Sequence, residues 1–216
     1  MEGVLHLGTL LAVVICFRRD IAELLLGVAR GEPKSKRYLF FLLLGTVPVV
    51  IMGLLLREGI EGAFSEVRLA GGLLLVTGVL LWSAERVLRR GPYGGLGLFQ
   101  ALAVGLAQAA ALLPGISRSG ATISVGILTG LDASEAARFS FLLAIPAIAG
   151  AGLFSVFSSA PGVHGGEVLE MAIGGVVAFA SGLFAIRFLL SLLFRGRLVP
   201  FALYCFAVGL CALFLG

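Results

Sequence analysis

Long apolar runs separated by short charged clusters make up most of this chain. Four stretches contain no Asp, Glu, Lys or Arg, namely residues 38–56, 69–84, 139–166 and 198–216. Each is near or above the ~18 apolar residues that favour a membrane-spanning helix. A buried core helix of a soluble protein would explain at most one of them, since a soluble protein with several would aggregate. We therefore predict an all-α polytopic integral membrane protein, with residues 1–216 forming a single transmembrane helical domain.

Composition supports a membrane protein and argues against a nucleic-acid-binding one. Hydrophobic residues make up 59% of the chain and charged residues 13%, about half of the ~25% found in soluble domains. The net charge of +4 arises from basic residues at the ends of apolar runs. Loops beside a negatively charged inner leaflet have this character.

Small residues inside the apolar runs indicate close helix packing. Gly174, Ala178 and Gly182 are spaced four apart, which predicts a ridge on which another helix packs. Cys16 and Cys205, like Cys211, lie inside apolar runs without a partner at metal-ligand spacing. We interpret them as packing residues rather than disulfide or zinc ligands.

The positive-inside rule assigns a side to each loop. Arg and Lys residues are frequent in loops 18–37, 86–90 and 195–197, which are predicted to be cytoplasmic, and scarcer in loops 57–68 and 158–170, which are predicted to lie outside. The segment between the second cytoplasmic loop and the next crossing must then enter and leave the membrane on the same side.

That segment, residues 95–131, is predicted to be a re-entrant helix pair. It contains two helical halves, 96–113 and 121–131, separated by residues 114–120. The second half has about 11 residues, too few for a full crossing. Non-helical backbone inside a membrane is tolerated only where protein or a water-filled cavity surrounds it. We therefore expect the tip of the pair to line a cavity.

Arg118 is the only charged residue between Arg90 and Asp132. A charge inside a membrane segment costs about 2.5 kcal/mol or more and usually marks a substrate path or a proton relay. The alternative is a structural arginine that reaches a lipid headgroup or holds a neighbouring carbonyl. The hydroxyls and glycines around Arg118 favour the functional interpretation.

The neighbours of Arg118 predict a phosphate cradle. Ser117 and Ser119 flank it, and Thr122 lies one turn into a helix expected to begin at about Ser119. The first amides of a helix are unpaired and carry the positive end of its dipole, and a guanidinium matches phosphate oxygens. Ser119 is either the N-cap of this helix or a ligand contact, and Gly120 permits close backbone approach.

Three further polar residues, Gln108, His6 and His164, differ in their expected relation to the site. Gln108 lies in the first re-entrant half and is expected to line the same cavity. His6 lies in an apolar run, where a packing histidine is the more frequent case, and His164 is expected in a solvated outer loop. No Ser-His-Asp set, metal cluster, Walker loop or dinucleotide fingerprint is present in the sequence.

The tip is part of a longer motif, in which Gly105-x-x-Gln108 is followed by Leu113-Pro114-Gly115-Ile116-Ser117-Arg118-Ser119-Gly120-Ala121-Thr122. This motif closely resembles the second signature motif of the undecaprenyl-diphosphate phosphatases, the bacitracin-resistance family. Residues 5–13, 45–48 and 139–146 resemble further parts of that family in order. The resemblance covers essentially the whole chain.

The resemblance implies an enzyme that hydrolyses undecaprenyl diphosphate to the monophosphate, recycles the lipid carrier for peptidoglycan synthesis and confers bacitracin resistance. It implies a multi-pass protein of the bacterial inner membrane whose active site opens to the outer face. The implied catalytic residues are Arg118, Ser117 and Thr122, and the implied substrate-binding residues are Ser119, Gly120 and Gln108. A divalent cation, Mg²⁺, is the implied cofactor, although its ligands are not present in this chain. The implied partners are the polyprenyl diphosphate and the membrane, with a homodimer as a further option and no nucleic acid.

One departure from the family concerns the start of the chain. The family is built from two inverted repeats, and the first opens with a glutamate-rich motif ending in Pro-x-Ser-Ser-x-Gly-His, which does not precede residues 5–8 here. The expectation is a misplaced start codon rather than a truly shortened relative, and residues 1–216 alone are expected to bind polyprenyl diphosphate weakly and hydrolyse it negligibly. Two alternatives stay open, a lipid-phosphate transporter or flippase and a pseudoenzyme that binds without cleaving.

Overall fold

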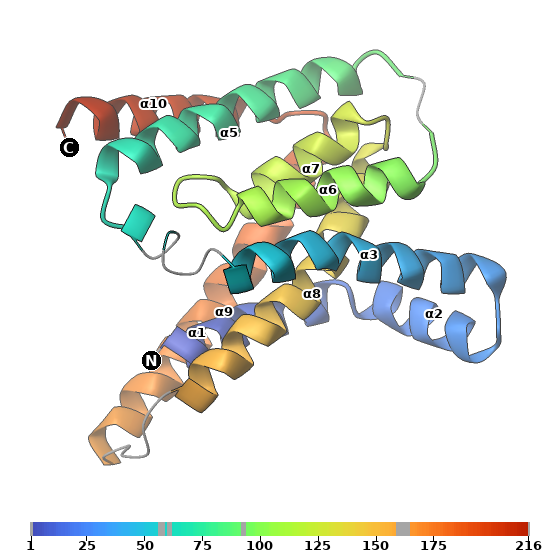
Figure 1. Cartoon of the computed structure of the whole chain (residues 1–216), viewed down its shortest axis with the longest axis horizontal. Helices are drawn as coiled ribbons and strands as arrows, with labels where there is room; N and C mark the ends of the chain where they lie inside the picture. Colours follow the sequence, from blue (N-terminus) through green and yellow to red (C-terminus); the bar gives the residue numbers. More distant parts are fainter. Residues whose placement is uncertain (1, 56–58, 60–61, 92–93, 159–164, 216) are drawn as a thin grey trace.

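The computed structural model describes residues 2–55, 59, 62–91, 94–158 and 165–215, and the described chain is helical without strands. Figure 1 shows the arrangement of the helices. In chain order they are α1 (Glu2–Cys16), α2 (Arg18–Ala29), α3 (Pro33–Leu55), α5 (Val67–Leu88), α6 (Leu98–Ala110), α7 (Arg118–Leu128), α8 (Ala133–Ser158), α9 (Gly165–Leu193) and α10 (Val199–Leu215).

The predicted polytopic membrane architecture is confirmed. Three described helices are long and apolar enough to cross a membrane, namely α3, α5 and residues 170–193 of α9. Large apolar side chains remain exposed on their outer faces, among them Leu54, Val79 and Phe184. Such surfaces suit contact with lipid, because water would make them aggregate. The inverted-repeat relation between the two halves stays a prediction.

Close helix pairs are made possible by glycine. A Cβ atom at Gly209 of α10 would lie 2.8 Å from the carbonyl oxygen of Gly71 in α5, so neither position has room for a side chain. The predicted ridge on α9 packs on α1 in the same way, where a Cβ atom at Gly182 would lie 3.3 Å from that of Ala12. Without a hydrophobic driving force between helices in lipid, such close packing is a main source of association.

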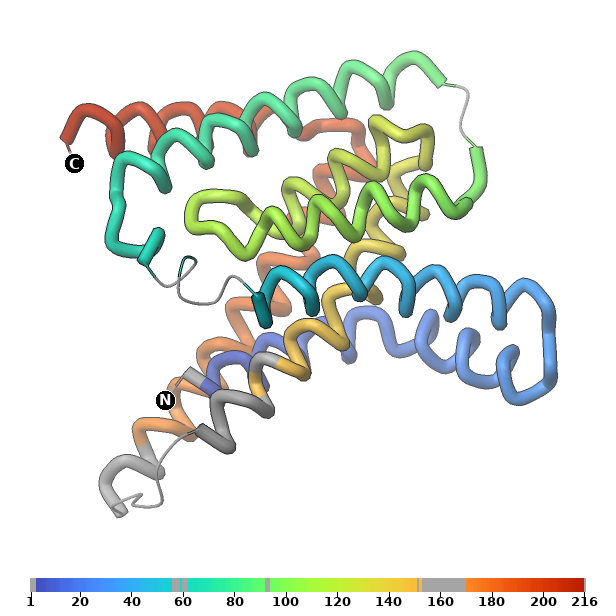
Figure 2. The backbone as a smooth tube through the Cα atoms, in the orientation of Figure 1, coloured from blue at the N-terminus to red at the C-terminus, as the bar shows by residue number. Residues whose placement is uncertain are grey.

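The short helices α6 and α7 lie side by side between α3 and α5 and pack on α8, as the backbone trace in Figure 2 shows. The first half is shorter than the predicted range 96–113, whereas the second has the predicted 11 residues but begins at Arg118 rather than near Ser119 or residue 121. Ile123 and Ile127 of α7 are fully buried together with Phe139 of α8. The hydrophobic core therefore encloses α7, and packing against α8 fixes α7 in place.

The two outer ends of the α6–α7 pair are joined. The backbone N–H of Gly94 donates to the carbonyl of Gly130 at 2.8 Å, and the side-chain amide of Gln100 donates to the carbonyl of Thr129 at 3.1 Å. A segment that enters and leaves on one side needs its ends together in this way. The re-entrant course of the pair and the face of the membrane on which its ends lie stay predictions.

Candidate functional site

The tip between α6 and α7 is a compact turn with helix-capping geometry. Gly115 has a φ of 90°, a conformation that L side chains rarely adopt, and a Cβ atom there would overlap the carbonyl oxygen of Ala70 in α5. Ser117 is the N-cap of α7, because its Oγ accepts a hydrogen bond from the N–H of Gly120 at 3.2 Å. Of the two predicted roles of Ser119, the N-cap is therefore wrong.

The start of α7 leaves two backbone donors without a protein acceptor. The N–H of Gly120 is used by the Ser117 hydroxyl, and the N–H of Ala121 donates to the Ser117 carbonyl at 2.8 Å. The N–H groups of Arg118 and Ser119 have no acceptor among the described residues. These two N–H groups lie at the N-terminal, positive end of the α7 dipole, where an anion is stabilised.

Arg118 presents its side chain to two cavities. The side chain is exposed, and within the described residues no carboxylate forms an ion pair with it. Arg118 and Ile148 of α8 both line the larger cavity, of about 590 Å³, and the smaller one, of about 290 Å³. An arginine with exposed donors between two cavities is available for a ligand, which favours the functional interpretation over the structural one.

The larger cavity has apolar walls and a few polar groups. Arg118, His6 and Gln108 supply the polar side chains. Gln108 is 1% exposed; its Nε2 donates to the carbonyl of Leu143 at 3.4 Å, whereas its Oε1 has no hydrogen-bond partner. The apolar walls come from Val49, Val50, Gly53, Leu54, Phe64, Ala111, Leu112, Pro146, Ala147 and Ile148. An apolar pocket on which a small number of polar groups converge is typical of a ligand site.

The smaller cavity collects hydroxyl groups. Ser119, Thr9 of α1 and Ser140 of α8 line it beside Arg118. The Ser119 side chain therefore faces a cavity, which keeps its predicted contact with a ligand open. The rest of its lining is apolar, with Val13, Phe141 and Ile186 among the residues, so the hydroxyl groups and Arg118 are the polar groups that this cavity offers to a ligand.

Three of the predicted site residues line neither of these cavities, namely the N-cap Ser117 and, behind the tip, Thr122 and Gly120. Thr122 is fully buried, its Oγ1 donating to the Arg118 carbonyl at 2.7 Å and lying 2.5 Å from Ser140 Oγ. Gly120 is also buried, and a Cβ atom there would lie 3.0 Å from the Thr77 methyl group. In this arrangement all three residues shape the tip, and their roles toward a ligand stay predictions.

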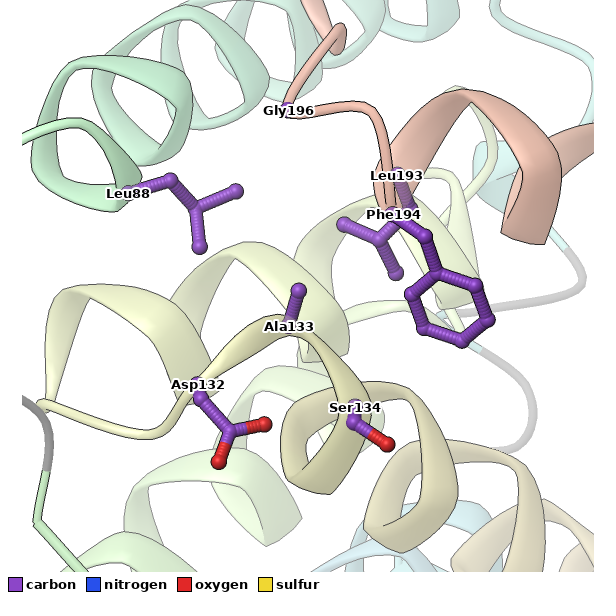
Figure 3. A pocket seen from close by; sticks show the side chains of 7 residues that line it. All are labelled: Leu88, Asp132, Ala133, Ser134, Leu193, Phe194 and Gly196. Carbon is purple, nitrogen blue, oxygen red and sulfur yellow. The ribbon is translucent and has the colours of Figure 1, made fainter.

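A third cavity, of about 360 Å³, lies at the opposite end of α7 and has a different character (Figure 3). Asp132 is its charged residue, and Asp132 Oδ1 accepts from the N–H of Glu135 at 2.8 Å at the start of α8. The lining contains a carboxylate and no basic side chain, so its charge would repel an anionic ligand. This cavity is therefore not a second phosphate site.

His6 is the residue that sequence reasoning missed. The sequence predicted a packing histidine, but the structure places His6 in the wall of the larger cavity with Arg118. The signal available in the sequence was its spacing from Thr9, because polar residues three apart share one face of a helix. His164, the other histidine, lies outside the described residues.

Comparisons with known proteins found a matching family and similar proteins. The family described as bacitracin resistance protein BacA matches residues 1–211. The undecaprenyl-diphosphatase of Syntrophotalea carbinolica is 43% identical over 96% of this chain and 80% of its own length. That of Korarchaeum cryptofilum is 43% identical over 98% of this chain and 82% of its own length, and that of Moorella thermoacetica 43% over 93% and 76%.

Proposed function

The chain belongs to the bacitracin resistance protein BacA family, and from this premise we propose that it is a phosphatase that hydrolyses undecaprenyl diphosphate to undecaprenyl phosphate. The similar proteins named above are undecaprenyl-diphosphatases. Their names favour hydrolysis over a lipid-phosphate transporter or a protein that only binds. The proposed cellular role is recycling of the lipid carrier for peptidoglycan synthesis, with bacitracin resistance as its consequence.

The position of Arg118 carries this proposal. Its guanidinium holds a fork of N–H donors that matches two phosphate oxygens, and the N–H groups of Arg118 and Ser119 add two donors at the start of α7. Donors fixed in place before the reaction stabilise the charge that develops on the transferred phosphoryl group. The apolar wall of the larger cavity is suited to the adjoining part of an isoprenoid chain.

The reaction is a hydrolysis of the diphosphate anhydride. Water forms a bond to the terminal phosphorus, the bond from that phosphorus to the bridging oxygen breaks, and inorganic phosphate and undecaprenyl phosphate separate. The water also loses a proton, and His6 is the candidate acceptor, since it lines the cavity with Arg118 and imidazole is the side chain most often used for proton transfer.

The divalent cation remains a proposal from the family resemblance. In the described part of the chain no group of three or more His, Cys, Asp or Glu side chains could hold a metal ion. The described residues therefore offer no ligand set for a protein-bound Mg²⁺, and we assign no chemical step to one. The inner-membrane location, the outward-facing site and a homodimer are likewise proposed.

Phosphate release from detergent-solubilised protein tests the proposed function. The substrate is undecaprenyl diphosphate, with farnesyl diphosphate as a shorter analogue, and the lipid product is identified by mass spectrometry. The sequence alone predicted negligible hydrolysis, but His6 and Arg118 line one cavity, and we therefore expect inorganic phosphate and lipid monophosphate in equal amounts. Movement of intact diphosphate across a liposome membrane without phosphate release would instead support a transporter, and binding without either would support a protein that only binds.

A further inference from the structure

Thr77 in the middle of α5 holds the tip by hydrogen bonds. Its side chain is completely buried, and its Oγ1 accepts a hydrogen bond from the N–H of Ser117 at 3.1 Å. The same Oγ1 lies 3.4 Å from the carbonyl of Gly115 and 3.4 Å from that of Leu73 in its own helix. A hydroxyl has one proton and two lone pairs, so the proton is shared between the two carbonyls while the Ser117 contact is kept.

The surface of α5 around Thr77 is in contact with the tip at two further positions. A Cβ atom at Gly115 would overlap the carbonyl oxygen of Ala70, and a Cβ atom at Gly120 would lie 3.0 Å from the Thr77 Cγ2 methyl group. Residues before and after Arg118 therefore rest directly on one helix. In a close-packed interior such contacts leave little room for displacement.

The Ser117 N–H needs this partner for a physical reason. Its partner Thr77 is completely buried, and a backbone donor left unpaired in such surroundings costs free energy comparable to a lost hydrogen bond. Ser117 is also the N-cap of α7, so its position sets where the next two N–H groups and the Arg118 guanidinium lie. Misplacing such groups by about 1 Å can cost on the order of 10²-fold in rate.

We propose that Thr77 is a positioning residue for the diphosphate site, and this inference rests on the function proposed above. Thr77 acts through the backbone of Ser117 and does not line either of the cavities that Arg118 lines. Its hydroxyl keeps the start of α7 in the orientation in which Arg118 and the free N–H groups meet the same anion. Removal of the hydroxyl should therefore weaken ligand binding, even though Thr77 never touches the ligand.

The test compares variants that differ in one hydroxyl. Thr77→Val keeps the shape and removes the hydroxyl, whereas Thr77→Ser keeps the hydroxyl. Thr46→Val in α3 is the matched control, because the Thr46 hydroxyl bonds the carbonyl of Leu42 in its own helix at 2.8 Å. The dissociation constant for farnesyl diphosphate and the hydrogen exchange of the peptide covering the tip are measured on solubilised protein.

We expect Thr77→Val to weaken binding roughly fivefold to tenfold, the size of one lost hydrogen bond, and to speed exchange at the tip. Thr77→Ser and Thr46→Val should bind within about twofold of the wild type. A merely structural role would lower the unfolding temperature of Thr77→Val but leave the dissociation constant of the folded protein unchanged, and this result would overturn the proposal. Should Thr77→Val fail to fold, Thr77→Ala is compared with Thr77→Ser. Both of these variants lack the Cγ2 methyl group, and they differ only in the hydroxyl.

The failure of the proposed function gives a different result. Wild-type protein would then release no phosphate from undecaprenyl or farnesyl diphosphate, whether or not it binds them and whatever residue stands at position 77. Exchange at the tip would still decide whether the Thr77 hydroxyl holds the Ser117 N–H, because that measurement needs no ligand. Equal exchange in the wild type and Thr77→Val would reject the positioning role by itself.

Discussion

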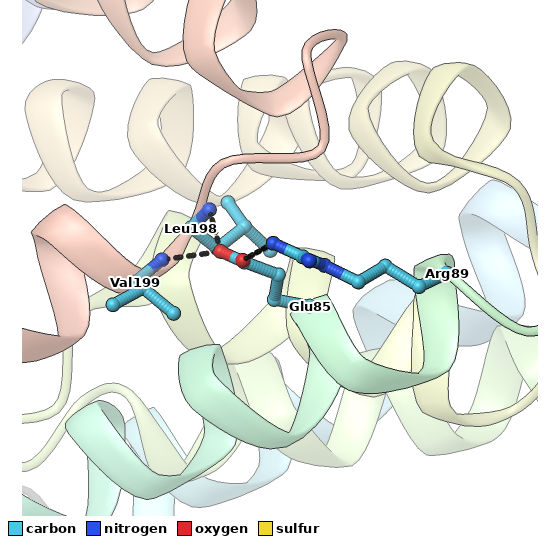
Figure 4. Close-up of polar contacts among 4 residues, drawn as sticks. All are labelled: Glu85, Arg89, Leu198 and Val199. Atoms are coloured by element: carbon cyan, nitrogen blue, oxygen red, sulfur yellow. Dashed lines mark hydrogen bonds and ion pairs between the residues drawn. The ribbon is translucent and has the colours of Figure 1, made fainter.

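The carboxylate of Glu85 in α5 accepts a hydrogen bond from the backbone N–H of Val199 at 2.6 Å, although 114 positions separate the two residues (Figure 4). The same Oε2 accepts from the N–H of Leu198 at 2.6 Å, and the other carboxylate oxygen pairs with Arg89 at 2.6 Å. A carboxylate from one helix thus caps the start of another, where N–H groups are unpaired and the dipole favours negative charge. Near its end α5 is fixed to α10 by Glu85, and in its middle it holds the tip by Thr77.

Glu85→Gln should destabilise the protein. The glutamine keeps the shape but loses the charge that two backbone donors and Arg89 share, and a hydrogen bond to a charged group contributes about 1.5–3 kcal/mol. We expect a lower unfolding temperature in detergent. Glu66→Gln is the control, because Glu66 precedes α5 without a side-chain capping bond. Equal unfolding temperatures for the two variants would show that the Glu85 cap contributes little.

Labelling of single cysteines should place both ends of the α6–α7 pair on one side of the membrane. The three native cysteines are first replaced, and Gly94→Cys and Ser134→Cys are then treated with a membrane-impermeant thiol reagent. Gly94 is hydrogen-bonded to Gly130, which lies four residues before Ser134. Gly94→Cys and Ser134→Cys should therefore both react from the cytoplasmic side, whereas Ser65→Cys should react from outside. Labelling of Gly94→Cys and Ser134→Cys from opposite sides would reject the re-entrant topology.

Arg118→Lys should weaken diphosphate binding although the charge is kept. A lysine ammonium is a point charge and cannot offer the two parallel donors of a guanidinium. We expect the dissociation constant for farnesyl diphosphate to rise at least about tenfold, which corresponds to ~1.4 kcal/mol. Arg187→Lys on the exposed face of α9 should have no such effect. If both variants bind as the wild type does, Arg118 is structural.

The sequence predicted two short helices joined by a turn because the cues are local, namely a short second half, a Pro-Gly break and a lone arginine. Their re-entry into the membrane stays a prediction. Gln108 was also correctly expected beside the cavity, since a polar residue in an apolar helix needs polar surroundings. The sequence offered Ser119 as the N-cap and missed Ser117, because both serines fit the pattern and the Ser117 N–H is held by Thr77, 40 positions away. His6 was missed for the same reason, since only the packing of α1 against α8 brings it to the cavity.

His6→Gln should separate turnover from binding. Because His6 lines the larger cavity with Arg118, it is the candidate that accepts the proton from water, and glutamine keeps hydrogen-bonding capacity without accepting a proton. General acid–base catalysis typically contributes 10²–10⁴-fold, so phosphate release should fall by at least about tenfold even if a second base shares the task. The dissociation constant for farnesyl diphosphate should stay within about twofold, because the guanidinium and the free N–H groups of α7 are unchanged. Thr46→Val in α3 is the control, since Thr46 lines neither cavity and its hydroxyl bonds the carbonyl of Leu42 in its own helix at 2.8 Å. Weaker binding with an unchanged maximal rate would make His6 a binding residue, and unchanged values of both would mean that the proton leaves by another route.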